Sequence, residues 1–229
     1  ITGVNESQIG DYIYSPIKLE RNEVYPVENY GSNVAPFYIV LSMWVGAVIT
    51  CVMLRIESST ETKYSPIEMY FGKLLLFIIM SLLQAAVTIS GLFLLGVEIE
   101  NPLLFTFSAA LISVTFMVLM YSLISALGQV GKGIGVVLLV LQISGTGGIY
   151  PIEIMDNVFQ TLYPYLPMTY AIDLIREAQL GVVWSNYLPA LAISIGIAVV
   201  TVIVAVIIKE KADDAAHYFE ERLNDTGLF

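Results

Sequence analysis

The sequence predicts an all-α integral membrane protein, a bundle of five transmembrane helices, on two observations. The first is composition: 57% of the 229 residues are hydrophobic, only 13% are charged, and the mean hydropathy is +0.77. A soluble domain normally carries about 25% charged residues, which it needs to cover its exterior. The second is that the apolar residues gather in five uncharged runs, as membrane helices require. The predicted spans are 36–54, 74–97, 103–126, 134–149 and 188–208.

The fourth run differs from the other four, which reach the roughly 20 apolar residues that a bilayer requires of a helix. It is shorter and ends in the sequence Gly145-Thr146-Gly147-Gly148. Backbone that unwinds at membrane depth must find its hydrogen bonds in protein or water, so it tends to mark a cavity or a pivot. We therefore place a candidate cavity or pivot at Gly145, Gly147 and Gly148.

Basic residues near the ends of the runs predict the orientation. If the first helix runs from outside to inside, the short outer connections hold only Arg176, close to Asp173 and Glu177, which can pair with it. The positive-inside rule then places the N-terminal end outside and the C-terminal end in the cytoplasm. An external start without a signal peptide predicts an upstream transmembrane helix and an extracellular domain. The inner connections hold Arg55, Lys63, Lys73, Lys132, Lys209 and Lys211.

The two ends of the chain are polar. Residues 1–34 contain several glycines and prolines and are interpreted as an extracellular juxtamembrane segment, the end of a further domain. Residues 209–229 form a cytoplasmic tail. The tail is either a short helix that meets a partner or a solvated, frayed end, and we favour the frayed end.

The connection between the fourth and fifth runs is predicted to hold a short re-entrant or interfacial helix pair on the outside. Pro164 and Pro167 separate the two helices, and Gly181 suits the end of the second. The alternative is a plain surface loop. Aromatic residues favour the headgroup region of the outer leaflet: Phe159, Tyr163, Tyr165, Tyr170, Trp184 and Tyr187.

Neutral polar residues interrupt the spans. Gln84, Tyr121 and Gln142 are the candidates that we add to the three glycines as a cavity or pivot. One interpretation is the lining of a substrate path or lateral groove. The other, which we favour, is hydrogen bonding between helices that holds the bundle together.

No catalytic, cofactor or metal site is predicted. Cys51 is the single cysteine and His217 the single histidine, so neither a metal cluster nor a histidine relay has partners. The sequence 128–133 resembles a phosphate-binding loop only faintly and is interpreted as an inner turn. The net charge of −10 argues against nucleic acid binding.

Several sequence blocks resemble the YhgE/Pip (phage infection protein) family. They are SPIKL at 15–19, NYGS at 29–32, APFY at 35–38 and LSMWVGA at 41–47. The blocks at 144–151 and 166–171 are similar to the membrane domains of ABC-2 type transporters more widely. The resemblance covers nearly the whole chain except the acidic tail.

The resemblance implies a fold, a location and partners. The chain is then the C-terminal part of a six-span ABC-2-like protein in the cell membrane of Gram-positive bacteria, with 35–208 as its transmembrane domain. Family members are linked to phage infection and to type VII secretion, through an extracellular domain that is absent here. Transport requires a nucleotide-binding ATPase from another chain, and a homodimer fits the family. The implied function is a permease-like export domain; the alternative is a membrane scaffold that does not transport.

Overall fold

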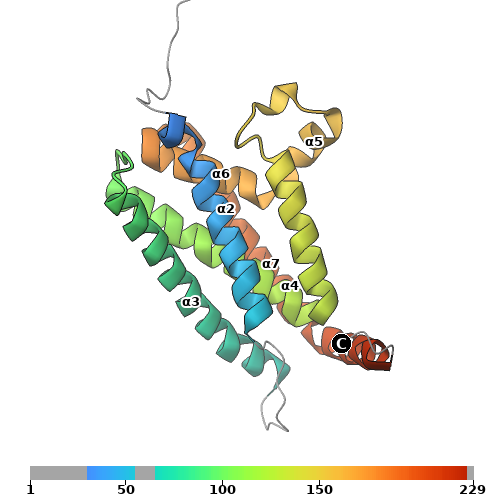
Figure 1. The fold of residues 1–229 in the computed structure, drawn as a ribbon. Helices are drawn as coiled ribbons and strands as arrows, with labels where there is room; N and C mark the ends of the chain where they lie inside the picture. The colour runs from blue at the N-terminus through green and yellow to red at the C-terminus, as the bar shows by residue number, and fades with distance from the viewer. Residues whose placement is uncertain (1–29, 55–64, 226–229) are drawn as a thin grey trace, which may run out of the picture.

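The computed structural model describes residues 30–54 and 65–225, and all regular structure in that part is helical, which confirms the all-α class there. Figure 1 shows long helices packed side by side. Beyond the end of α4 lies the connection 146–183 with its short helices, which we call the hairpin. The long helices are α2 (Tyr30–Met53), α3 (Pro66–Leu94), α4 (Pro102–Gly145) and α7 (Trp184–Asp225). The short ones are η1 (Ile152–Ile154), α5 (Asn157–Leu162), η2 (Tyr163–Tyr165) and α6 (Pro167–Leu180).

Four helices of the described part are long and apolar enough to cross a membrane, where the sequence predicted five separate spans. The difference lies in α4, whose 44 residues contain 103–126 and all of 134–149 except its last four residues. Its backbone leaves the helical region at Gly128, with φ 56° and ψ −129°, and Figure 1 shows the helix turning back there. We call 102–127 the first leg and 129–145 the second leg. The predicted inner turn at 128–133 therefore coincides with a break inside one helical element.

Helix boundaries depart from the hydropathy runs where capping decides them. α3 begins eight residues before the predicted position 74, because Ser65 caps it. The Ser65 hydroxyl accepts from the Glu68 amide at 3.3 Å, and the Ser65 amide donates to the Glu68 carboxylate at 2.8 Å. This capping box satisfies two backbone donors that a helix start leaves open. α2 begins at Tyr30 and contains Pro36, which we had expected at its start.

The first leg of α4 is the centre of the bundle and packs against α2, α3 and α7. Its buried side chains include Phe105, Ile112 and Phe116. The peripheral helices α3 and α7 have only 28% and 17% of their most apolar segments buried, against 56% for α4. An apolar surface of this extent on α3 and α7 is what lipid, not water, would solvate.

Glycines allow the second leg to return closely along the first. A Cβ atom on Gly131 would lie 2.5 Å from the carbonyl oxygen of Leu123, and one on Gly135 would overlap the end of Met120. Only residues without a side chain permit this backbone approach.

The C-terminal tail is helical further than we favoured, since α7 continues to Asp225. Residues 226–229 and most of 1–34 lie outside the described residues. So do Arg55 and Lys63, on which part of the predicted orientation depends.

Candidate functional site

The six residues predicted for a cavity or pivot lie in three separate places. Gln84 is in the middle of α3, and Tyr121 is in the first leg of α4 near its break. Only Gln142 and the glycines at 145, 147 and 148 lie together, where the second leg ends beside α6. The structure thus brings four of the six residues to one junction.

Gln84 joins α3 to α2. Its Nε2 donates a hydrogen bond to the carbonyl oxygen of Ser42 at 2.9 Å. The amide reaches that backbone because Gly46 has no side chain, and a Cβ there would overlap the Gln84 amide. This geometry corresponds to hydrogen bonding between helices, the interpretation that we favoured for the neutral polar residues.

Tyr121 joins α4 to the first turns of α3. Its hydroxyl donates to the carbonyl oxygen of Tyr70 at 2.9 Å, while the Tyr70 hydroxyl lies 2.6 Å from that of Ser122. The ring of Tyr121 also contacts Phe77, with centroids 4.9 Å apart. All of these side chains are buried, so the pair of bonds fixes the start of α3 against the first leg.

Gln142 caps helix α6 from a different helix. Its Oε1 accepts a hydrogen bond from the backbone amide of Met168 at 3.0 Å, in the first turn of α6. Pro167 precedes it and has no amide hydrogen, and Leu166, the N-cap residue, supplies no side-chain oxygen. Gln142 is fully buried, and its Nε2 has no hydrogen-bond partner among the described residues.

The three glycines make room for α2 and α6 at the same junction. A Cβ on Gly145 would lie 2.7 Å from the side chain of Leu166, and one on Gly148 would overlap the ring of Phe37. Gly147 has φ +62°, a conformation that side chains disfavour. The positive φ of Gly147 turns the chain out of the helix here.

The following hairpin is not a uniform interfacial pair. α5 has no buried residue, but nine of the 14 residues of α6 are buried against α2, α4 and α7. The predicted aromatic group divides in the same way. Tyr165 and Trp184 are 80% and 58% exposed, whereas Tyr187 is buried with its hydroxyl 2.9 Å from that of Ser108.

Glu177 is a buried carboxylate, predicted from the sequence only as a possible ion-pair partner of Arg176. It accepts hydrogen bonds from the Val183 amide at 2.6 Å and from the Asn186 side chain at 3.0 Å, at the start of α7. A carboxylate at a helix N-terminus is stabilised by the open amides and the helix dipole. The sequence feature that could have indicated this contact is Gly181. Its φ of 130° turns the chain tightly enough to bring α7 back to α6.

Asp173 and Arg176 form the ion pair that the sequence suggested, at 3.1 Å. Burial raises the pKa of the Asp173 carboxyl above its ordinary value, and the positive charge of Arg176 offsets part of that rise. Burial, followed by the charge of Asp173, raises the pKa of Tyr163. The hairpin is therefore a partly desolvated, acidic region.

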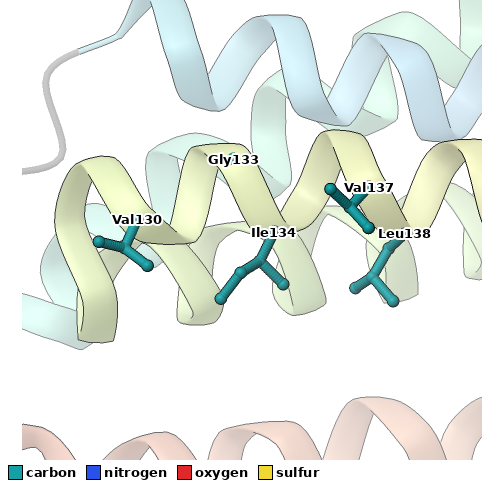
Figure 2. A pocket seen from close by; sticks show the side chains of 5 residues that line it. All are labelled: Val130, Gly133, Ile134, Val137 and Leu138. Atoms are coloured by element: carbon teal, nitrogen blue, oxygen red, sulfur yellow. The ribbon is translucent and has the colours of Figure 1, made fainter.

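A shallow groove of about 420 Å³ runs along the second leg. Figure 2 shows Val130, Ile134 and Leu138 pointing from α4 toward the ribbon of α7. Val137 and Gly133 complete the lining, which offers no polar side chain to orient a ligand.

The described residues contain few groups that could carry out acid–base or metal chemistry. No group of three His, Cys, Asp or Glu side chains there could hold a metal ion. Cys51 is buried, with its sulfur 3.7 Å from that of Met117. What the arrangement offers is hydrogen bonding between helices that end and restart at one junction.

Comparisons with known proteins bear on this arrangement. A family described as "ABC-2 family transporter protein" matches residues 6–207. The "Uncharacterized protein YhgE" of Bacillus subtilis (strain 168) is 28% identical over 199 residues, which are 83% of this chain and 25% of that relative. The chain thus spans about a quarter of the relative's length. No solved structure matches. The predicted resemblance is confirmed, and the chain belongs to the ABC-2 family transporter proteins as a multi-pass membrane domain.

Proposed function

We propose that this chain is the permease-like membrane domain of an export system or a cell-surface assembly, driven by an ATPase on another chain. In this proposal α4 crosses the bilayer twice, which gives five spans. Residues 1–34 lie outside, 35–208 form the membrane domain, and 209–229 lie in the cytoplasm. Two copies of the domain form the complete unit, as the family resemblance implies.

The observation that carries the proposal is the position of α6. It follows the end of α4 at Gly145, its first turn is capped by Gln142, and it contacts α2, α4 and α7. Any rearrangement of those helices must therefore move α6, which lies at the end of the bundle that we assign to the outside. Gln142 and the three glycines serve as its pivot, while Gln84 and Tyr121 hold α3 in place.

The ATPase is expected to contact the inner connection that includes residues 55–64, between α2 and α3. Copurification of the full-length protein from its native membrane tests this. A transporter brings down a nucleotide-binding protein, and charge reversal at Arg55 and Lys63 lowers its recovery. Recovery of no ATPase under conditions that keep the membrane protein intact would overturn the energised mechanism.

A scaffold that does not transport is the second candidate. It is favoured by one observation: three quarters of the YhgE relative lies outside the part that this chain matches. A scaffold for phage-receptor or secretion components should keep its role when the inner connection is altered, and should lose it when the rest of the protein is removed. A transporter should instead lose its role when the inner connection is altered.

Thiol labelling of intact cells tests the orientation. Asp156→Cys, in the hairpin before α5, should react with a reagent that cannot cross the membrane, whereas Lys132→Cys should not. Cys51, the one cysteine of this sequence, is buried and gives little background. Reaction of Lys132→Cys alone would reverse the proposed topology.

A further inference from the structure

α7 presents one narrow buried stripe to the rest of the bundle. In its described side chains, the buried residues are Tyr187, Ala190, Ser194 and Ala205. At 100° per residue they fall within about 60° of the helix circumference. α7 packs most extensively on α4, so this stripe, Ser194 included, faces α4.

The first leg of α4 carries hydroxyl side chains at intervals of seven residues. Ser108, Thr115 and Ser122 are 0%, 2% and 3% exposed. The outer two are bonded: Ser108 lies 2.9 Å from the Tyr187 hydroxyl, and Ser122 lies 2.6 Å from that of Tyr70. The hydroxyl of Thr115, between them, has no hydrogen-bond partner among the described residues.

Register places Ser194 level with Thr115. The first leg of α4 and α7 run in the same direction, as Figure 1 shows, and Tyr187 meets Ser108 near the start of both. Seven residues further along, a rise of about 10.5 Å on each helix, come Thr115 and Ser194. A spacing of seven keeps residues of packed helices on their shared face.

The free hydroxyl is unusual for a membrane helix. Serine and threonine there normally bond to the carbonyl of the preceding turn, as Ser108 does to Leu104 at 2.8 Å. Thr115 has the same option and does not use it. A buried polar atom without a partner is unfavourable in hydrocarbon, so a group held between the helices is expected to satisfy it.

Resting on the proposed permease function, we propose that Thr115 and Ser194 bind an uncharged hydrogen-bonding group, a hydroxyl or an amide, of the molecule that passes through the domain. No Asp, Glu, Lys, Arg or His lies among the buried residues of the first leg or of the α7 stripe in the described part, which favours an uncharged ligand. The Ser108–Tyr187 and Tyr70–Ser122 pairs close the site at its two ends.

Cysteine labelling of the full-length protein in membrane vesicles tests this, with Cys51→Ala as background. Iodoacetamide, an uncharged amide, should alkylate Thr115→Cys and Ser194→Cys about tenfold faster than Ala109→Cys, because a dry apolar setting suppresses the reactive thiolate. Ala109 is equally buried on the same leg but faces away from the hydroxyl row. Iodoacetate, which is charged, should show a much smaller difference.

Equal iodoacetamide rates at positions 109, 115 and 194 would overturn the proposal. So would equal enhancement by iodoacetate, because that would indicate ordinary wetting without selection against charge. The two cysteine positions lie on different helices, so a variant that fails to fold still leaves the other to decide. The labelling needs no ATPase, so it fails or succeeds separately from the copurification that tests the proposed function.

Discussion

The two legs of α4 are similarly apolar and lie in opposite surroundings. The first leg is buried on nearly every face, with Phe105, Ile112 and Phe116 filling the space between helices. The second leg exposes about half or more of Val136, Val137 and Val140. Its buried residues are instead Gly131, Gly135, Gln142 and Gly145.

The difference shows that two ways of packing operate in one helical element. The first leg is held by side-chain volume, which gives many small dispersion contacts. The second leg is held by close backbone approach at glycines, by Leu138 and Leu139 against the core, and by an amide hydrogen bond to α6. An element that buries less side-chain volume can move with less loss of packing, which suits a pivot.

The largest effect is expected where the two legs touch. Gly131→Ala places a methyl group against the Leu123 carbonyl, at 2.5 Å, and should destabilise the protein by about 3 kcal/mol. Gly133→Ala meets nothing within 4 Å and should be neutral or slightly stabilising. Unfolding in mixed detergent micelles measures both. Equal stabilities would show that the legs are not in close contact.

The next effect compares side chains from the two legs. Phe116→Ala removes a buried ring that contacts Trp44, with centroids 4.9 Å apart, and should destabilise by about 3 kcal/mol through the cavity that it leaves. Val137→Ala removes a side chain that is 59% exposed and should change stability by less than about 0.5 kcal/mol. Unfolding in mixed detergent micelles measures both variants. A larger loss of stability for Val137→Ala than for Phe116→Ala would contradict a buried first leg and an exposed second leg.

A smaller effect is expected at the cap of α6. Gln142→Met keeps the volume and removes the acceptor of the Met168 amide, which should destabilise by about 1 kcal/mol. Hydrogen exchange at the Met168 amide should accelerate, while amides in the first leg should not change. Gln129→Met, on the exposed start of the second leg, is the matched control. Unchanged exchange at Met168 would contradict the capping role.

The smallest effect concerns pH. Because burial raises the pKa of Asp173, the folded state holds that proton more tightly than the unfolded state. Stability is then lost as the pH rises from the ordinary carboxyl range, near about pH 4, through the raised pKa. Asp173→Asn should flatten that decline in thermal melts taken across the range. Glu153→Gln, which removes an exposed charge nearby, should not, and a flattened curve in that control would point to net charge instead.

Local signals predicted much of this fold. Hydropathy located the long helices, since apolar length decides which segments can cross a bilayer. The position of 128–133 between two apolar runs predicted an inner turn, and the backbone leaves the helical region at Gly128. The neutral polar residues were interpreted as hydrogen bonds between helices, and the geometry of Gln84 and Tyr121 agrees with that interpretation. Capping by Ser65 moved the start of α3 to Pro66, before the hydropathy run begins, because a local hydrogen bond stabilises the helix start there.

The remaining features depend on partners far apart in the chain. Tyr187 was assigned to the headgroup region for its aromatic character, but its hydroxyl bonds to Ser108, 79 residues away. Gln179 similarly donates to the Ser32 carbonyl across 147 residues. Nothing in the composition of α6 distinguishes a helix on the membrane surface from one inside the bundle, because both are amphipathic. Only tertiary packing separates the two.

The length of α7 has a mechanical consequence. Its 42 residues extend about 63 Å, roughly twice the hydrocarbon thickness of a bilayer. A continuous helix of that length moves as one stiff rod, and its N-terminal end is held by the contacts of Glu177 and Tyr187. A tilt of a few degrees at that end would displace the far end by several ångströms. Events at one membrane surface would thereby become a displacement at the other, with no separate relay in between.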